Sequence, residues 1–243
     1  MINLYNCDCF EFMNTIPDSS IDLIYTDPPY DVSISRGGTV NTRCKLNETL
    51  QPLKDNKIDK GYDIRKAGFE FLRIMKEPNI YIWCNKKQII DYFNFYVNEI
   101  GCKFDILVWN KTNALPTYSN KYLSDCEYCL YFHKGKGKCF PQTYEDAKTV
   151  YQSPINRENK IYDHPTIKPL SFVSSHIKNS TRENDVVFDP FMGSGTTGVA
   201  CRQLNRNFIG CEIIEKHFET AKKRCGVDGE IKLINKSGKK KLI

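Results

Sequence analysis

The chain has 243 residues, 40% of them hydrophobic and 26% charged, and its formal net charge is +6. This content excludes a disordered or fibrous protein and suits one folded domain over residues 1–243. The small positive charge is compatible with binding a polyanion but does not decide it. No apolar run is long enough to cross a membrane and none resembles a signal peptide, so we expect a cytoplasmic protein with reduced thiols.

In the first half of the chain, apolar runs typical of strands alternate with helical patterns. We expect strands over 1–6, 21–26, 79–84 and 104–109. Helical spacing begins at Phe10, covers 69–75 and continues over 88–100, where Gly101 closes it. Residues 31–62 are polar and rich in turn-forming residues, which predicts a long loop.

The second half continues this alternation around further polar stretches. Strands are expected over 125–132, 185–188 and 207–212, and helices over 170–177 and from Gly198 onward. Residues 135–161 are polar and irregular, and the basic tail 231–243 ends in lysines, which indicates a frayed, solvated end. Strands that alternate with helices predict an α/β fold with a doubly wound, mainly parallel sheet and helices on both faces.

The corner Asp27-Pro28-Pro29-Tyr30 follows the expected strand 21–26. Asp27 and Pro28 each precede a proline, which favours extended backbone, and neither proline has an N–H, so the corner offers mainly acceptors. A carboxylate and a projecting carbonyl can grip an exocyclic amine that bears two hydrogens, and Tyr30 can supply a ring face beside it. The amino group of adenine fits this description, while a rigid turn with a buried tyrosine is the structural alternative.

A glycine-rich turn lies between an expected strand and an expected helix, with the sequence Asp189-Pro190-Phe191-Met192-Gly193-Ser194-Gly195-Thr196-Thr197. Gly193 and Gly195 let a ligand approach the backbone, and the helix N-terminus favours a negative group. Glu212 ends the next strand, where an acid can accept hydrogen bonds from ribose hydroxyls. The layout predicts a nucleotide-type cofactor, and the missing third glycine disfavours a dehydrogenase. Asp8, Asp27, Asp189 and Glu212 all fall at carboxyl ends of expected strands, where ligands of such sheets bind.

Eleven cysteines are present, and Cys126-x-x-Cys129 has a spacing that invites a metal hypothesis. No second pair follows at the distance of a zinc ribbon. Both residues fall in an expected strand, so we interpret them as small buried hydrophobic side chains and expect no metal site.

Together these segments resemble the amino-methyltransferases of DNA, which use S-adenosylmethionine. Residues 26–30 resemble their catalytic motif, 189–197 resemble their cofactor motif, and 164–169 are similar to a segment that precedes the cofactor loop in one subclass. The catalytic motif comes first here, which is the order of the beta subclass. The resemblance covers about residues 3–222. It implies a Rossmann-like class I methyltransferase fold and a site-specific enzyme that methylates adenine N6 in duplex DNA, with base flipping and direct in-line transfer.

The resemblance also implies roles for matching residues. Asp27 and the Pro28 carbonyl would accept the two hydrogens of the target amine, with Pro29 in the same catalytic corner and Tyr30 stacked on the flipped base. Glu212 would hold the cofactor ribose, Asp8 the cofactor adenine, and Lys168 the cofactor carboxylate. The remaining cofactor-binding residues implied are Asp27, Asp189, Phe191, Gly193, Ser194, Gly195, Thr196 and Thr197. His164 is interpreted as stabilising a turn, without a role in proton transfer.

Duplex DNA is the expected partner, and the loop 31–62 and the region 112–163 are the candidate contact segments. Basic residues that could meet phosphates are Arg36, Arg43, Lys45, Lys134, Lys136 and Lys138. A homodimer and a cognate restriction endonuclease are further candidate partners. Three alternatives stay open: cytosine N4 as the acceptor, an RNA substrate, and a cofactor-binding subunit without activity. The intact Asp27, Gly193 and Gly195 argue against the inactive subunit.

Overall fold

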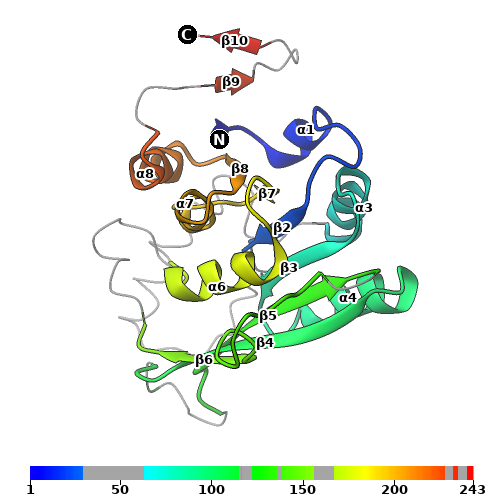
Figure 1. Cartoon of the computed structure of the whole chain (residues 1–243), viewed down its shortest axis with the longest axis vertical. Helices are drawn as coiled ribbons and strands as arrows, with labels where there is room; N and C mark the ends of the chain where they lie inside the picture. The colour runs from blue at the N-terminus through cyan, green and yellow to red at the C-terminus, as the bar shows by residue number, and fades with distance from the viewer. Residues whose placement is uncertain are drawn as a thin grey trace, which may run out of the picture.

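The computed structural model describes residues 1–29, 63–114, 116, 122–135, 138–155 and 167–227, and the backbone of 232–234 and 240–242. The strands are β1 (Ile2–Asn6), β2 (Leu23–Thr26), β3 (Asn79–Cys84), β4 (Lys103–Lys111), β5 (Cys126–His133), β6 (Val150–Ser153), β7 (Val186–Asp189), β8 (Asn207–Glu212), β9 (Lys232–Ile234) and β10 (Lys240–Leu242). The helices are α1 (Cys9–Met13), α3 (Ile64–Ile74), α4 (Ile89–Phe93), the π-helix η1 (Asn94–Glu99), α6 (Leu170–Ser180), α7 (Thr196–Gln203) and α8 (Glu215–Cys225) (Figure 1).

Eight strands form one sheet in the order β1-β8-β7-β2-β3-β5-β4-β6. Within this sheet only β5 is reversed: it runs antiparallel to β3 and β4, while every other neighbouring pair is parallel. The carboxyl ends of seven strands and the amino end of β5 therefore share one edge. The expected mainly parallel, Rossmann-like sheet is confirmed.

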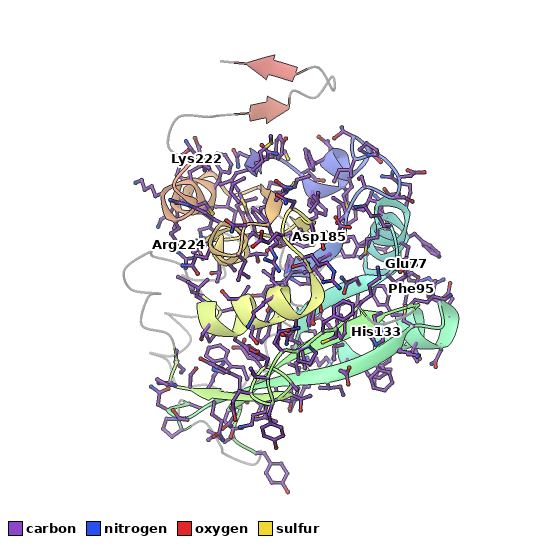
Figure 2. The ribbon with its side chains drawn as sticks, viewed as in Figure 1. Glu77, Phe95, His133, Asp185, Lys222 and Arg224 are labelled. Atoms are coloured by element: carbon purple, nitrogen blue, oxygen red, sulfur yellow. The ribbon has the colours of Figure 1, made fainter. Side chains whose placement is uncertain are left out.

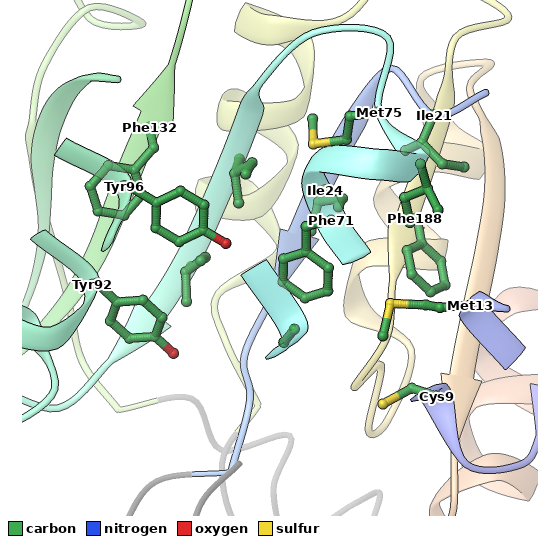
Figure 3. Packing of buried hydrophobic residues seen from close by; sticks show 14 of the residues in the cluster. Cys9, Met13, Ile21, Ile24, Phe71, Met75, Tyr92, Tyr96, Phe132 and Phe188 are labelled. Atoms are coloured by element: carbon green, nitrogen blue, oxygen red, sulfur yellow. The ribbon is translucent and has the colours of Figure 1, made fainter. Parts of the chain in front are cut away.

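Helices cover both faces of the sheet, and each face has its own hydrophobic core. Helices α1, α3, α4 and η1 pack on one face, where Phe71 and Phe132 are fully buried (Figure 3). Helices α6, α7 and α8 pack on the other face (Figure 1). Strand β2 supplies both cores by simple alternation, with Ile24 in the first core and Leu23 and Tyr25 in the second. Burial on both faces anchors the strand ends that carry the candidate site.

Three segments differ from the sequence expectation. Strand β6 lies within 135–161, where its exposed and half-buried residues give no apolar pattern. The helix expected over 88–100 begins as α4 but continues as η1, with Ile100 N–H donating to the Phe95 carbonyl. Gly101 closes it at φ +77°, as expected. The tail expected to fray instead forms an antiparallel pair, β9 with β10.

None of the helices in the described ranges has the length and apolar character needed to span a membrane.

Candidate active site at the carboxyl edge of the sheet

Four acidic residues meet at the edge where the parallel strands end. Asp27 directly follows β2, Asp189 ends β7, Glu212 ends β8, and Asp8 lies just beyond β1. Strands β1 and β8 are paired so that Asn6 lies opposite Glu212. This edge is where open α/β sheets bind their ligands.

Asp27 lies beside the glycine-rich loop because β2 and β7 are neighbours. Ile24 pairs with Phe188 on β7, so the two neighbouring strands that lead to Asp27 and to the loop end at the same edge. The Asp27 side chain is 26% exposed, so its carboxylate remains accessible at the edge. The corner that could grip an amine and the loop that could hold a cofactor are thus adjacent in space.

Asp189 anchors the start of that loop. Its Oδ1 accepts a hydrogen bond from Phe191 N–H at 3.1 Å, and its Oδ2 accepts one from Thr197 Oγ1 at 2.6 Å. Burial raises the pKa of the Asp189 carboxyl to about 7, and the hydrogen bond from Thr197 opposes this rise. Asp189 therefore ties the loop to the first turn of α7.

Glu212 joins the loop to the neighbouring strand. Its Oε2 accepts from Gly193 N–H at 3.0 Å and its Oε1 accepts from Ile214 N–H at 2.7 Å. Burial raises the pKa of Glu212 to about 7, although these backbone donors lower it. Gly193 has φ +51°, a left-handed conformation that suits glycine, and so it can present its N–H to Glu212.

Gly195 is required by the packing of the loop itself. Its φ is +79°, and a Cβ added there would lie 2.9 Å from the Cβ of Ala221 and 3.2 Å from Cys225 Sγ, both on α8. The sequence suggests that a side chain at Gly195 would occupy the space of a ligand. The structure shows that it would first collide with α8.

Arg224 of α8 holds the same loop from the other side (Figure 2). Its Nη1 donates to the Ser194 carbonyl at 2.9 Å, to Ser194 Oγ at 2.8 Å and to Thr196 Oγ1 at 3.0 Å. The hydroxyls of Ser194, Thr196 and Thr197 are therefore all engaged within the protein. Each hydroxyl oxygen has further capacity to accept a hydrogen bond.

Asp8 caps α1. Its Oδ1 accepts hydrogen bonds from Phe10 N–H at 2.7 Å and Glu11 N–H at 3.1 Å. This contact explains the local need for an aspartate, and it fixes the carboxyl group at the carboxyl edge of the sheet, near the end of β8.

Lys168 lies against Asp27 rather than at the glycine-rich loop. Its Nζ forms an ion pair with Asp27 Oδ2, lies 3.2 Å from Glu127 Oε2, and sits 4.9 Å from the centre of the Trp83 ring. Glu127 is in turn paired with Lys111. The role of Lys168 toward a cofactor carboxylate stays a prediction.

Several predicted residues lie outside the described residues: Tyr30, Arg36, Arg43, Lys45, Lys136 and His164. Two of the lysines proposed for phosphate contact are described. Lys134 Nζ donates to the Ile100 carbonyl at 2.9 Å, and Lys138 pairs with Glu77 at 2.9 Å. Cys126 and Cys129 fall on β5 as expected. Cys129 is fully buried, but Cys126 is only half-buried, because it lies at the start of the strand.

Comparison with known proteins gives a consistent result. Residues 21–223 match the family described as DNA methylase, the N6 and N4 amino-methyltransferases. The chain belongs to this family. The methylase is 29% identical over 238 residues to the Type II methyltransferase M2.LlaDCHI of Lactococcus lactis subsp. cremoris, covering 91% of this chain and 88% of that protein. It is 32% identical over 247 residues to the Type II methyltransferase M.HinfI of Haemophilus influenzae, covering 89% of this chain and 66% of that protein.

The fold of the methylase is also similar to a solved structure, the crystal structure of an M1.HpyAVI–SAM complex. The TM-score is 0.67 at 28% identity, with 92% of this chain and 100% of that chain covered. This likeness agrees with the Rossmann-like sheet described above.

Sequence reasoning on the methylase missed three charged residues of this edge: Glu127, Lys111 and Arg224. Lys111 and Glu127 reach the edge from β4 and from the reversed strand β5, and Arg224 reaches it from α8. Only the antiparallel pairing of β5 brings Glu127 level with Trp109 at the carboxyl end of β4. Within 112–163, β5 and β6 belong to the central sheet. The role of the region in target recognition stays a prediction.

Proposed function

We propose that this methylase transfers a methyl group from S-adenosylmethionine to the N6 amine of adenine in duplex DNA. The observation that carries the proposal is the adjacency of Asp27 and the 189–197 loop on neighbouring strands. A methyl donor held by that loop and an amine held by Asp27 would meet without a further conformational step. Positioning of the two reactants then supplies much of the rate.

S-adenosylmethionine supplies a methyl group made electrophilic by the attached sulfonium. The chain has groups that fit it. Glu212 is placed to accept from ribose hydroxyls and Asp8 to accept from the adenine amine. Phe191, Gly193 and Gly195 belong to the loop that follows β7, the neighbour of the strand that leads to Asp27, and the helix N-terminus at Thr196 suits the methionine carboxylate. We assign the methionine part to the backbone of this loop, because its hydroxyls already hold the loop together.

Asp27 and the Pro28 carbonyl act on the target amine. The nitrogen lone pair of an aromatic amine is delocalised into the ring, so the amine is a weak nucleophile. Acceptance of both hydrogens draws the nitrogen toward tetrahedral geometry and directs the lone pair at the methyl group. Pro28 and Pro29 lack N–H groups, so the corner offers the amine acceptors rather than competing donors. The base must leave the duplex to reach this corner, and we assign Tyr30 the stacking contact that receives it.

The choice of adenine over cytosine rests on Asp27. Family members that modify cytosine N4 more often carry a serine at this position. An aspartate does not forbid cytosine, so cytosine N4 is the second candidate. Duplex DNA would approach the carboxyl edge, with residues 31–62 and the parts of 112–163 outside β5 as the proposed contacts.

Methyl transfer from labelled S-adenosylmethionine to duplex DNA, followed by digestion and nucleoside analysis, tests the proposal. The expected product is N6-methyladenine. Recovery of N4-methylcytosine instead would show that cytosine N4 is the acceptor. Labelling of RNA in a parallel reaction would show that RNA is the substrate. Cofactor binding without transfer to any of a broad set of DNA sequences would support the inactive subunit.

A further inference from the structure

Four side chains of alternating charge follow one another in contact, in the order Asp27, Lys168, Glu127 and Lys111. Lys168 Nζ contacts Asp27 Oδ2 on one side and lies 3.2 Å from Glu127 Oε2 on the other. Glu127 Oε1 is paired with Lys111 Nζ. The exposed fractions of the side chains are 26% for Asp27, 7% for Lys168, 20% for Glu127 and 17% for Lys111. Asp27 is thus the most exposed member and Lys168 the most buried.

Strand β5 sets the position of Glu127. Because β5 is antiparallel, Glu127 near its beginning pairs with Trp109 near the end of β4. The next residue, Tyr128, pairs with Cys84 at the end of β3. Glu127 therefore emerges at the carboxyl edge between β3 and β4, and β3 alone separates its strand from β2, which leads to Asp27. A rigid sheet position is the kind of support that orients a neighbouring group.

The four side chains are held together by electrostatics in a buried setting. Burial lowers the pKa of Lys168, but Asp27 and Glu127 raise it by more, so the pKa lies above its ordinary value. Burial raises the pKa of Glu127, but Lys168 and Lys111 lower it by more, so it lies below its ordinary value. Lys168 and Glu127 are therefore both held charged, and a buried charge that loses its partner is strongly destabilising.

We propose that Glu127 is a positioning residue for methyl transfer, which holds the Lys168 ammonium against Asp27. Lys168 binds one oxygen of the Asp27 carboxylate and so fixes the orientation in which that carboxylate meets the amine. Glu127 also adds a second negative charge beside Lys168. This inference rests on the proposed function.

The first test is Glu127→Gln in the full chain, compared with Glu70→Gln. Glu70 forms an ion pair of 2.7 Å with Arg73 on α3 and is 28% exposed, so it controls for the loss of a partly buried ion pair away from the strand ends. We expect Glu127→Gln to lower kcat by about 10- to 100-fold, because a small misplacement of a reacting group has that effect. S-adenosylmethionine affinity should stay within about twofold of wild type, as a uniform loss of binding is not expected. Equal kcat values for Glu127→Gln and wild type would overturn the proposal.

A pH profile separates positioning from a purely structural role. The groups that face Lys168 are the carboxylates of Asp27 and Glu127, the thiols of Cys84 and Cys129, and Lys111 behind Glu127. With Glu127 neutral, Lys168 keeps one carboxylate partner, so its pKa should fall. The alkaline limb of the kcat profile should move to lower pH by about one unit or more, whereas Glu70→Gln should leave it in place. An unmoved limb would contradict the proposal.

The double variant Glu127→Gln/Lys111→Met covers the case in which Glu127→Gln does not fold. The second substitution removes Lys111, the lysine that would otherwise lose its carboxylate partner when Glu127 becomes neutral. We expect it to regain stability but not kcat. Recovery of kcat along with stability would show that Glu127 acts only in folding.

A readout that needs no turnover keeps this inference distinct from the proposed function. Titration of the Lys168 ammonium by ¹⁵N NMR, assigned with Lys168→Arg, reports its pKa in wild type and in Glu127→Gln. If the wild-type protein methylates nothing, the proposed function is refuted. A lowered Lys168 pKa in the variant would still support the contact between Glu127 and Lys168. An unchanged Lys168 pKa together with unchanged kcat would remove the inference alone.

Discussion

Arg224 and Ser194 are joined by two hydrogen bonds, from Arg224 Nη1 to the Ser194 carbonyl at 2.9 Å and to its hydroxyl at 2.8 Å. The contact fixes the cofactor loop to α8. Arg224→Ala should weaken S-adenosylmethionine binding by about tenfold, because hydrogen bonds from a charged donor contribute about 1.5–3 kcal/mol each and part is regained by water. Calorimetry measures the affinity. Arg202→Ala is the matched control, since Arg202 of α7 donates to the Cys225 carbonyl of α8 at 3.0 Å. An equal loss in both variants would assign the effect to helix packing.

Asp27→Asn keeps the shape of the side chain and removes its charge. We expect kcat to fall by about 100-fold or more, as loss of a group aimed at developing charge does in other enzymes. Cofactor affinity should stay within a few-fold, because the loop is held by Asp189, Glu212 and Arg224 instead. Single-turnover rates on DNA give the first quantity and calorimetry gives the second. Near-native turnover in Asp27→Asn would exclude Asp27 from the chemistry.

Gly195 and Gly101 allow backbone strain to be separated from packing. Their φ values are +79° and +77°, but a Cβ on Gly101 would meet nothing within 4 Å. Gly101→Ala should cost about 1 kcal/mol of unfolding free energy from backbone strain alone, and Gly195→Ala should cost about 1–3 kcal/mol more from overpacking against Ala221. Denaturant unfolding measures both. Ala221→Gly combined with Gly195→Ala should recover part of the extra cost and of the cofactor affinity. If the two single variants are equally stable, the contact with Ala221 is unimportant.

The raised pKa values of Asp189 and Glu212, both about 7, predict a pH dependence of cofactor affinity. Ribose hydroxyls donate to the ionised form of Glu212, so affinity should rise as the pH increases from 6 to 8. Glu212→Gln should bind more weakly and show a smaller rise, with the remainder due to Asp189. Parallel curves for the two proteins would mean that Glu212 does not titrate in this range.

The same shift affects stability with a defined sign. The folded protein keeps the Glu212 proton up to a pH of about 7, whereas the unfolded chain releases it near its ordinary value. The unfolding free energy from this group should therefore be highest at low pH and fall as the pH rises toward 7. Between pH 5 and pH 8 the wild type should lose up to about 2 kcal/mol more than Glu212→Gln in urea titrations. A larger loss in the variant would give the opposite sign and reject the assignment.

Tyr30→Ala tests capture of the extruded base. The loss of rate should be larger on an ordinary A·T pair than on DNA whose target adenine is mispaired, because a mispaired base costs less to unstack. The measurement is the ratio of single-turnover rates on the two duplexes. An equal loss of rate on the two duplexes would mean that Tyr30 shapes the pocket and does not stack on the extruded base.

The strand pattern predicted most of the fold because nearly every core strand is a continuous apolar run between turn residues. The 185–188 and 207–212 runs became β7 and β8, and the alternation of strands with helices gave the parallel sheet. Strand β6 was missed because an edge strand with exposed side chains pairs through its backbone, which leaves no hydrophobic pattern. The change from α4 to η1 was missed because the π segment, with hydrogen bonds from i to i+5, spans only Asn94–Glu99, which is too short to change the hydrophobic pattern.

The acids of the site were predictable because each one directly follows a recognisable strand. Glu127 was not, since its position depends on β5 running against its neighbours, and local sequence does not record strand direction. Arg224 was not, since a helix packed across the loop brings it there from thirty positions further along the chain. Their roles depend on tertiary pairing, whereas those of Asp27 and Glu212 follow from local order.

The pairing of β1 with β8 joins residues that are 206 positions apart, Asn6 and Glu212. The proposed ribose acceptor and Asp8, which caps α1, are therefore held together only after residue 212 has been synthesised. A ribosome-bound chain that ends before β8 lacks one wall of the cofactor pocket, and long-range pairings of this kind form slowly. Cofactor retention should consequently mark the last stage of folding during translation, which stalled chains of increasing length would reveal as a single late step at the emergence of Glu212.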